Sequence, residues 1–264
     1  MAVVTSREGT LNRHRAPLPT RVDSLPDLPG AYDAELERAV ATLGVVLTAG
    51  ARAAIDGHVR LLLAWNEAIN LTAIREPVAI ARQHVADSLS ALVLVRAGPH
   101  ARIADLGSGG GFPGMPLAAA LPETIVELVD SVAKKTGFLE AVAMATGLAG
   151  RVHIATMRAE ALPRRQPFDV VTARAVGALA ELVELALPIL KPGGRLIAWK
   201  RGDLVTELAA GGRAARALGG GVPRVHEVPA TTGLEGHVLV EIRRERPAPE
   251  GYPRDPASRR RQPW

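Results

Sequence analysis

The sequence predicts an α/β fold, in which a mostly parallel seven-stranded sheet ends in an antiparallel hairpin and follows an N-terminal helical section. Three observations support this prediction. From Ala101 onward, short apolar runs alternate with stretches of helical periodicity, as expected for a parallel sheet with helices on both faces. Before Ala101 the apolar residues recur at helical spacing. The last two apolar runs are separated by a short turn, as in a hairpin.

The N-terminal part divides into an arm and a helical section. Residues 1–30 are rich in Pro, Arg and Thr without apolar periodicity, so we predict a disordered arm. Residues 31–98 form the helical section. Its first helix begins near Tyr32, Thr48 is suited to cap the second, and Pro77 is suited to open a third. We read no membrane-spanning run and no signal peptide, and expect a cytoplasmic protein.

The core, residues 99–246, is expected to contain seven strands and four helices. The strands are predicted at 102–106, 125–130, 151–155, 168–173, 194–199, 223–229 and 237–243. The helices are predicted at 114–121, 133–146, 177–187 and 203–216. The Thr231–Gly236 turn joins the last two strands. Residues 247–264 are expected to form a basic, flexible tail.

Composition excludes some chemistry and suggests a partner. The chain of 264 residues has no cysteine, which excludes a thiolate nucleophile, an iron–sulfur cluster and a thiolate zinc site. We expect no metal. Its net charge is +5, and from Arg243 to Trp264 seven arginines stand against three acids. Such a tail is typical either of binding to a polyanion or of a solvated chain end. Of the 32 basic residues four are lysines.

The segment from Arg102 to Gly114 is the most informative. An apolar run ends in Asp105, and glycines follow at once, including Gly107 and Gly109. Glycines allow a sharp turn and close approach of the backbone to a ligand, and the next helix offers free N–H groups. A carboxylate does not suit a pyrophosphate but suits an ammonium group, such as the amino end of S-adenosylmethionine (SAM). We therefore favour SAM over a nicotinamide or flavin cofactor and over a purely structural turn.

Phe112 supports the same choice. In register with the strand end, the loop has Phe112 where a dinucleotide-binding loop has its third glycine. We interpret Phe112 as a wall against the adenosine or methionine part of the cofactor.

Polar residues at the ends of the next strands extend this site. Asp130 ends the second strand, where an acid binds ribose hydroxyls, although it also suits a helix cap. Ala159 and Glu160 follow the third strand, beside the expected adenine, although Glu160 also suits a solvated helix. Arg174 follows the fourth strand and is suited to a methionine carboxylate or a phosphate, although such an arginine is often a surface residue.

The acceptor side is predicted from basic residues and from two absences. Lys134 and Lys200 lie at carboxyl ends of strands, where ligands bind in such sheets. His84 shares a helix face with Asp87 and Ser88, a spacing that favours a structural cluster. The sequence has no Asn/Asp-Pro-Pro-Tyr/Phe motif for polarising amines and no cysteine. The acceptor should therefore hold a free lone pair, as guanine N7 does, and need positioning rather than a general base.

These motifs together resemble a known family. A parallel sheet with a terminal antiparallel hairpin is typical of Rossmann-like class I SAM-dependent methyltransferases. Over about residues 32–256 the chain resembles the bacterial small-subunit rRNA guanine-N7 methyltransferases, RsmG or GidB. The matching segments are 70–74, 82–89, 105–116, 130–131 with 134–135 and 138–139, 158–160, 172–175, 199–200 and 252–254.

The resemblance implies methyl transfer from SAM to N7 of a guanine in the decoding region of 16S rRNA. It implies SAM contacts at Gly107, Phe112, Ala159, Glu160 and Arg174. The partner would be 16S rRNA or the 30S subunit, and we expect a monomer.

The sequence also suggests further candidate site residues and two alternative functions. Asp105, Gly109 and Asp130 are further cofactor candidates, and Lys134, Lys200 and His84 are candidates for contact with RNA. No residue is assigned as catalytic, because positioning is expected to suffice. The alternatives are a SAM-dependent methyltransferase of a small molecule or protein, and a non-catalytic RNA-binding or ribosome-assembly factor.

Overall fold

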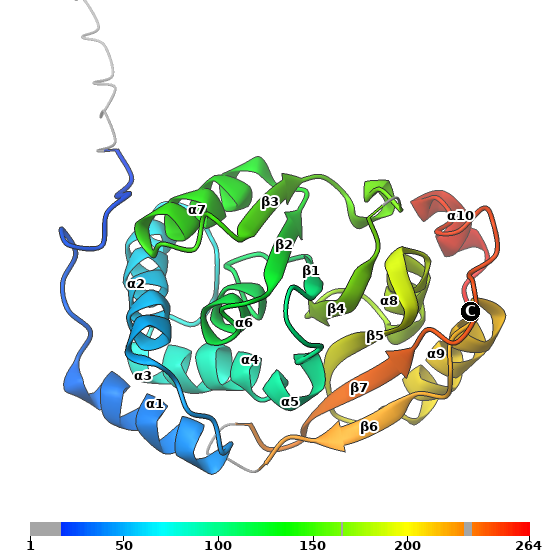
Figure 1. Cartoon of the computed structure of the whole chain (residues 1–264), viewed down its shortest axis with the longest axis horizontal. Coiled ribbons are helices and arrows are strands. Elements are labelled where there is room, and N and C mark those ends of the chain that lie inside the picture. The colour runs from blue at the N-terminus through cyan, green and yellow to red at the C-terminus, as the bar shows by residue number, and fades with distance from the viewer. Residues whose placement is uncertain (1–16, 165, 230–233) are drawn as a thin grey trace, which may run out of the picture.

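A seven-stranded mixed sheet organises the chain (Figure 1). The structure is a computed structural model and describes residues 17–164, 166–229 and 234–264. The strands are β1 (Arg102–Leu106), β2 (Ile125–Asp130), β3 (Val152–Thr156), β4 (Phe168–Arg174), β5 (Leu190–Arg201), β6 (Arg224–Glu227) and β7 (His237–Arg243). Their order in the sheet is β3-β2-β1-β4-β5-β7-β6. The predicted fold class is confirmed, although part of the predicted turn at 231–236 lies outside the described residues.

The pairing of the strands gathers their carboxyl ends at one edge. β1 pairs in parallel with β2 and with β4, β2 with β3, and β4 with β5. β7 runs antiparallel to β5 and to β6. The residues that follow β1, β2, β3 and β4 therefore meet at the same edge, where ligands bind in open α/β sheets.

Helices cover both faces of the sheet, as the alternation of side chains along β1 shows. Ile103 belongs to one buried cluster and Ala104 to the other, because successive strand residues point to opposite faces. The first cluster also contains residues of α1 (Gly30–Thr42), α2 (Ala49–Asn66), α6 (Gly114–Ala120) and α7 (Ala133–Ala145). The second contains residues of α8 (Leu179–Ala186) and α9 (Val205–Ala217).

The third predicted helix is interrupted at the point that faces the site. It comprises α3 (Pro77–Ile80), the π-helix η1 (Ala81–Ala86), α4 (Asp87–Leu89) and α5 (Leu92–Val95). A π-helical turn is rare and is found mostly at functional sites. The segment Pro77–Val95 is long and apolar enough to cross a membrane, but 56% of its most apolar stretch is buried inside the protein. Most of its apolar residues lie in the first core cluster, as in a core helix of a globular protein.

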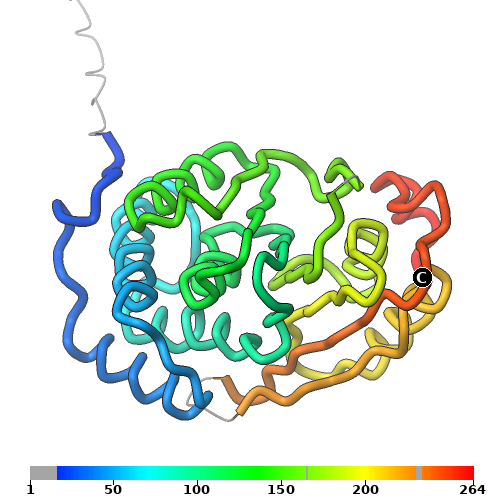
Figure 2. Tube along the Cα trace, in the orientation of Figure 1, coloured from blue at the N-terminus to red at the C-terminus, as the bar shows by residue number. Residues whose placement is uncertain are grey.

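Residues 17–29 form a strap beside α2 (Figure 2). The indole Nε1 of Trp65 donates a hydrogen bond to the carbonyl oxygen of Pro19 at 2.7 Å. Leu18, Val22, Leu25 and Leu28 pack against the first core cluster. Residues 17–29, predicted as part of a disordered arm, are therefore held against the core. The apolar side chains that hold them are not spaced as in a helix, so the sequence pattern did not mark them. Residues 1–16 lie outside the described residues.

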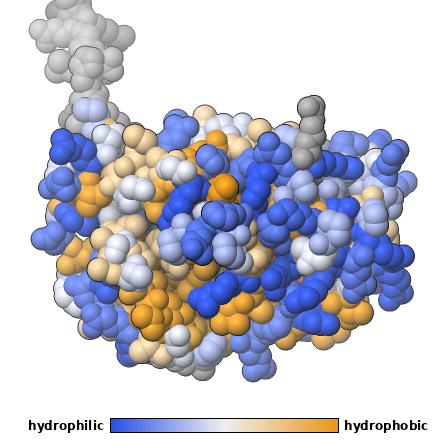
Figure 3. All heavy atoms as spheres, in the orientation of Figure 1, coloured by the Kyte–Doolittle hydropathy of each residue, from blue (hydrophilic) through white to orange (hydrophobic). Residues whose placement is uncertain are grey.

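The C-terminal segment also makes specific contacts, in contrast to the flexible tail expected from its charge. The carboxylate of Glu184 in α8 is fully buried and accepts hydrogen bonds from the backbone and guanidinium of Arg254. It also accepts one from the indole of Trp264 at 2.7 Å. Helix α10 (Pro256–Arg261) lies between these two anchors. Hydrophilic side chains gather at this end of the molecule, at the right of Figure 3.

Candidate cofactor and acceptor sites

Asp105 lies beneath the glycine loop and ties it to the sheet. Its Oδ1 accepts a hydrogen bond from the Thr172 hydroxyl at 2.8 Å, and its Oδ2 accepts one from the Gly114 amide at 3.2 Å. The side chain is fully buried. Burial raises the pKa of the carboxyl to about 6, against the hydrogen bonds, which lower it. Both carboxylate oxygens hold the loop in this structure, and a contact with the ammonium group of the cofactor stays a prediction.

The loop itself is shaped by glycines and by Asp130. Gly107 has φ +72°, and a Cβ there would lie 2.4 Å from a side-chain carbon of Val176. The amide of Gly109 donates to Asp130 Oδ2 at 3.0 Å, and Oδ1 accepts from the Val132 amide at 2.9 Å. The capping interpretation of Asp130 is wrong, because the N-cap of α7 is Val132 and the helix has no side-chain cap hydrogen bond. The carboxylate of Asp130 instead braces the turn before the helix. It leaves lone pairs for ribose hydroxyls, because each carboxylate oxygen accepts more than one hydrogen bond.

Phe112 is packed against two rings of the N-terminal helices. It is 5% exposed. Its ring stacks against His58 with centroids 4.5 Å apart and against His84 with centroids 4.7 Å apart. The guanidinium carbon of Arg174 lies 5.5 Å from the ring centroid. The N-terminal helices therefore fix the position of Phe112, and its role as a wall against the cofactor stays a prediction.

His58 is a site residue that the sequence argument missed. It lies on the buried face of α2, and its Nε2 lies 2.8 Å from the carbonyl oxygen of Gly110. Burial lowers its pKa to about 4, so at neutral pH the ring is uncharged and Nε2–H donates to this carbonyl. A Cβ on Gly111 would lie 2.9 Å from Nε2. The available signal was a lone histidine among the apolar residues of a helix.

Arg174 joins the end of β4 to the π-helix. Its Nη1 donates to Asp87 Oδ2 at 2.9 Å and to the Gln83 carbonyl at 3.2 Å, and its Nη2 lies 3.2 Å from His84 Nδ1. Ala175, the next residue, has φ +56°, a left-handed conformation that costs a non-glycine residue about 1 kcal/mol. The guanidinium is therefore fixed from both sides of the site.

His84 completes this fixation as a neutral ring. Because Nδ1 faces a donor on Arg174, it accepts, and Nε2–H donates to the Thr72 hydroxyl at 2.7 Å. Burial and the charge of Arg174 lower the pKa of His84 to about 3. The hydroxyl of Ser88 donates to the carbonyl of His84 at 2.6 Å. The structural-cluster interpretation of His84, Asp87 and Ser88 fits, and both ring nitrogens of the candidate RNA contact are already engaged.

A cleft of about 510 Å³ opens beside Arg174. It is lined by Ile74, Gln83, His84, Asp87, Arg174, Ala175, Trp199, Lys200, Arg201 and His237. Asp87 connects several of these lining residues. Its Oδ1 lies 3.0 Å from His237 Nδ1, and its backbone carbonyl accepts a hydrogen bond from the indole of Trp199 at 2.8 Å. Lys200 lies at this cleft as predicted, but its ammonium contacts Glu207 at 2.6 Å.

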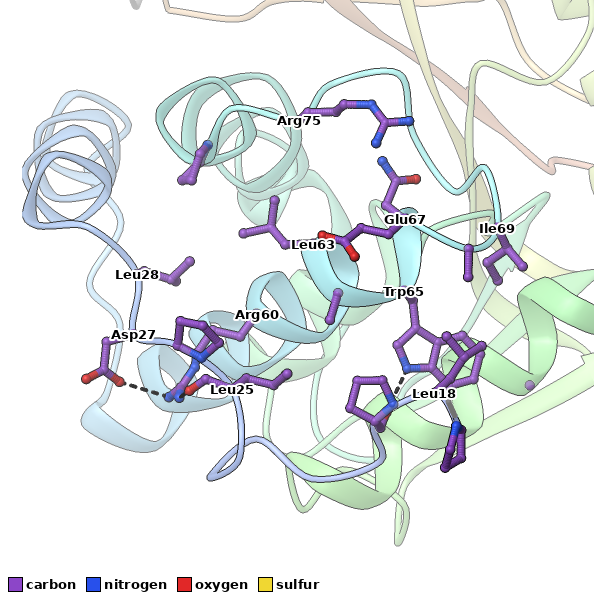
Figure 4. Close-up of a pocket in the computed structure, with 18 of the residues that line it drawn as sticks. Leu18, Leu25, Asp27, Leu28, Arg60, Leu63, Trp65, Glu67, Ile69 and Arg75 are labelled. Carbon is purple, nitrogen blue, oxygen red and sulfur yellow. Dashed lines mark hydrogen bonds and ion pairs between the residues drawn. The ribbon is translucent and has the colours of Figure 1, made fainter. Parts of the chain in front are cut away.

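Lys134 lies elsewhere. It lines a separate cavity of about 1130 Å³ between the strap, α2 and α7. Figure 4 shows the apolar side chains of this cavity, among them Leu25 and Leu63, and the ion pair between Asp27 and Arg60. Lys134 and Lys200 therefore line different cavities, although both were predicted at carboxyl ends of strands.

Ala159 and Glu160 lie in the short 3-10 helix η2 (Ala159–Ala161) that follows β3. Glu160 Oε1 accepts a hydrogen bond from the guanidinium of Arg259 in α10. Burial raises the pKa of Glu160, but its own backbone amide and Arg259 outweigh this and hold the pKa below its usual value. Glu160 is thus an anion at neutral pH.

The donor set fits SAM. Carboxylates follow β2 and β3, where a ribose diol and an adenine amine need acceptors. The glycine loop, residues 105–114, contains no Lys or Arg. This arrangement suits an adenosine ligand that carries positive charge and does not suit a pyrophosphate.

Residues 51–232 match the family model described as GidB, rRNA small subunit methyltransferase G. The chain belongs to this family. An rRNA small subunit methyltransferase G from Symbiobacterium thermophilum is 38% identical over 232 residues, which cover 85% of this chain and 94% of the relative. One from Sorangium cellulosum is 42% identical over 199 residues, 74% and 81% of the two chains.

A solved structure supports the fold. A SAM-dependent O-methyltransferase from Thermotoga maritima superimposes with a TM-score of 0.53 over 72% of this chain and 73% of that one, at 16% identity. The fold is therefore that of class I SAM-dependent methyltransferases, and SAM is the cofactor of the GidB family, as the glycine loop predicted.

Proposed function

We propose that this chain transfers a methyl group from SAM to N7 of a guanine in 16S rRNA. Membership of the GidB family supports the reaction class and the rRNA substrate. The observation that carries the choice of acceptor atom is the cleft beside Arg174, in which His84 and Asp87 are already hydrogen-bonded through both of their polar side-chain atoms. His84 and Asp87 are therefore fixed partners for a base in this cleft, and neither offers a free polar atom as a general base.

The chain would hold the cofactor through four groups. Asp130 would accept from the ribose hydroxyls, and Glu160 from the adenine amine. The backbone of Gly107 and Gly109 would line the methionine side, above the charge of Asp105. When bound, SAM supplies an electrophilic methyl group on a sulfonium.

On the acceptor side the residues position rather than deprotonate. Guanine N7 holds a lone pair and loses no proton before attack, so it requires alignment with the methyl group. His84 is not suited to act as a base, since its pKa is about 3. In addition, its Nδ1 is bonded to Arg174 and its Nε2 to Thr72, so neither ring nitrogen is free. Trp199 is 6% exposed and forms the floor of the cleft beside Asp87, which suits a flat base.

The same proposal includes the form of the substrate, the oligomeric state of the enzyme and its location in the cell. The substrate is 16S rRNA within the 30S subunit or naked, the enzyme acts as a monomer, and it works in the cytoplasm. Lys200, which lies at the cleft and pairs with Glu207, would meet a phosphate next to the acceptor nucleotide.

The test is transfer of tritiated methyl from SAM to 16S rRNA, naked and in 30S particles, with the product nucleoside identified by mass. We expect 7-methylguanosine, which is cleaved by borohydride and aniline, and a rate without a general-base limb above neutral pH. Asp130→Asn should reduce transfer, while Asp23→Asn, at an exposed position, should not. A product of N6-methyladenosine, N2-methylguanosine or 5-methylcytidine would refute the acceptor assignment.

A further inference from the structure

We propose that the C-terminal helix α10 completes the adenine end of the cofactor site, with Arg259 as a positioning residue that holds Glu160. The inference rests on the proposed function, because it takes Glu160 as a contact to adenine. It assigns a specific role to a tail whose charge alone suggested only a polyanion partner.

Arg259 points inward and bridges two elements at the carboxyl edge of the sheet. Its Nη2 binds Glu160 Oε1, in the loop after β3, and lies 3.3 Å from Glu181 Oε1, in the first turn of α8. Its Nη1 donates to the carbonyl of Arg254 at 3.1 Å. The side chain of Arg259 is 10% exposed and that of Glu160 is 19% exposed. This pair is therefore shielded from water, unlike an ordinary surface ion pair.

The helix that carries Arg259 is anchored at both ends. Before it, Arg254 makes a bidentate pair with the buried carboxylate of Glu184. After it, the indole of Trp264 donates to the same carboxylate, and the Arg254 guanidinium carbon lies 4.9 Å from the Trp264 ring centroid. Asp255 caps the helix by accepting from two backbone amides. Arg259 is thus presented to Glu160 from a fixed base.

A held glutamate is a better acceptor for adenine than a free one. Fixing a free glutamate side chain costs rotamer entropy, and Arg259 fixes the side chain of Glu160 before the cofactor binds. The carboxylate still has room for an amine donor, because it accepts up to about four hydrogen bonds. Arg259 should therefore strengthen binding of SAM without contacting it.

Arg260 provides a matched control. It is the same residue type in the same helix, one position later, and its side chain is exposed. If the tail acts only as a basic surface, Arg259→Gln and Arg260→Gln should have the same effect on rRNA binding and none on SAM.

The experiment measures the dissociation constant of SAM by calorimetry, together with KM for SAM and for 16S rRNA, in Arg259→Gln, Arg259→Lys and Arg260→Gln. The rotamer entropy lost on fixing one glutamate side chain corresponds to roughly tenfold in affinity. We expect Arg259→Gln to weaken SAM by about that factor with KM for rRNA unchanged, Arg259→Lys to recover part of the loss, and Arg260→Gln to leave SAM affinity unchanged. In a Glu160→Gln background, Arg259→Gln should weaken SAM binding little further.

The outcomes separate this inference from the proposed function. Unchanged SAM affinity in Arg259→Gln, or a change confined to KM for rRNA, overturns the inference even if Glu160→Gln weakens SAM. If Glu160→Gln itself leaves SAM affinity unchanged while 7-methylguanosine still forms, the inference falls and the proposed reaction stands. Absence of 7-methylguanosine from the wild-type reaction refutes the reaction independently of the binding data.

Discussion

Asp105→Asn should make the protein more stable at neutral pH while weakening its hold on SAM. The carboxylate of Asp105 is fully buried between the Thr172 hydroxyl and the Gly114 amide. An asparagine of the same shape accepts from Gly114 through its oxygen and donates to Thr172 through its amide nitrogen. The substitution therefore keeps both hydrogen bonds and removes the buried charge.

The magnitude follows from the pKa of Asp105, which burial raises from 3.8 to about 6. Between these values the folded state binds more protons than the unfolded state, so the stability of the wild type falls as pH rises through this window. At 1.36 kcal/mol for each unit of pKa difference, the buried charge of Asp105 lowers the unfolding free energy of the wild type at neutral pH by about 3 kcal/mol. The variant does not titrate at this position, so it should escape that cost and melt about 8 °C higher near pH 7.5.

The assay is thermal unfolding of both proteins at several pH values. The difference in unfolding free energy should be largest above about pH 6.5 and should approach zero below about pH 3, where the side chain is protonated in both the folded and the unfolded state. Asp23→Asn serves as control, since Asp23 is exposed. SAM titration should show weaker binding by Asp105→Asn, because the negative charge beneath the loop is gone. A variant that is less stable at pH 7.5, or a difference that does not change with pH, would contradict this reasoning.

Three further predictions concern the loop, the basic residues and the tail. Gly107→Ala should abolish SAM binding in calorimetry, because the new methyl carbon would lie 2.4 Å from a valine side chain. Lys200→Ala should leave SAM affinity unchanged and weaken rRNA binding, with the salt slope lower by about one; Lys134→Ala, in the other cavity, tests whether that surface also contacts RNA. Glu184→Gln should lower the unfolding free energy by about 3–5 kcal/mol in denaturant titrations, since it breaks a buried pair with Arg254. An unchanged unfolding free energy in Glu184→Gln would show that the tail is not anchored at Glu184.

The sheet was predictable because its signals are local. Each parallel strand is a short apolar run with a glycine or proline near one end, and the order of runs and helical stretches restricts the topology. The boundaries moved by a few residues, as for β5, which begins at Leu190 rather than 194. The positions of Asp130, Glu160 and Arg174 at the carboxyl edge follow directly from the strands that precede them.

The contacts of those residues were less predictable, because they depend on partners far along the chain. His58 meets Gly110 across 52 positions, and Arg254 meets Glu184 across 70. No local pattern marks such a partner. The π-helical turn that presents His84 was also hidden, since its apolar spacing resembles that of an ordinary helix.

The structure adds a second role to the glycine loop. The sequence predicts that the loop holds the cofactor, with Phe112 as a wall. In the structure, Phe112 and the Gly110 carbonyl also hold the loop against two neutral histidines of the N-terminal helices. One of these, His84, also binds Arg174 at the acceptor cleft. Because both low pKa values keep the rings uncharged at physiological pH, the joint between cofactor loop and acceptor cleft holds its geometry without titrating. A reaction that proceeds by alignment, rather than by proton transfer, depends on that fixed geometry.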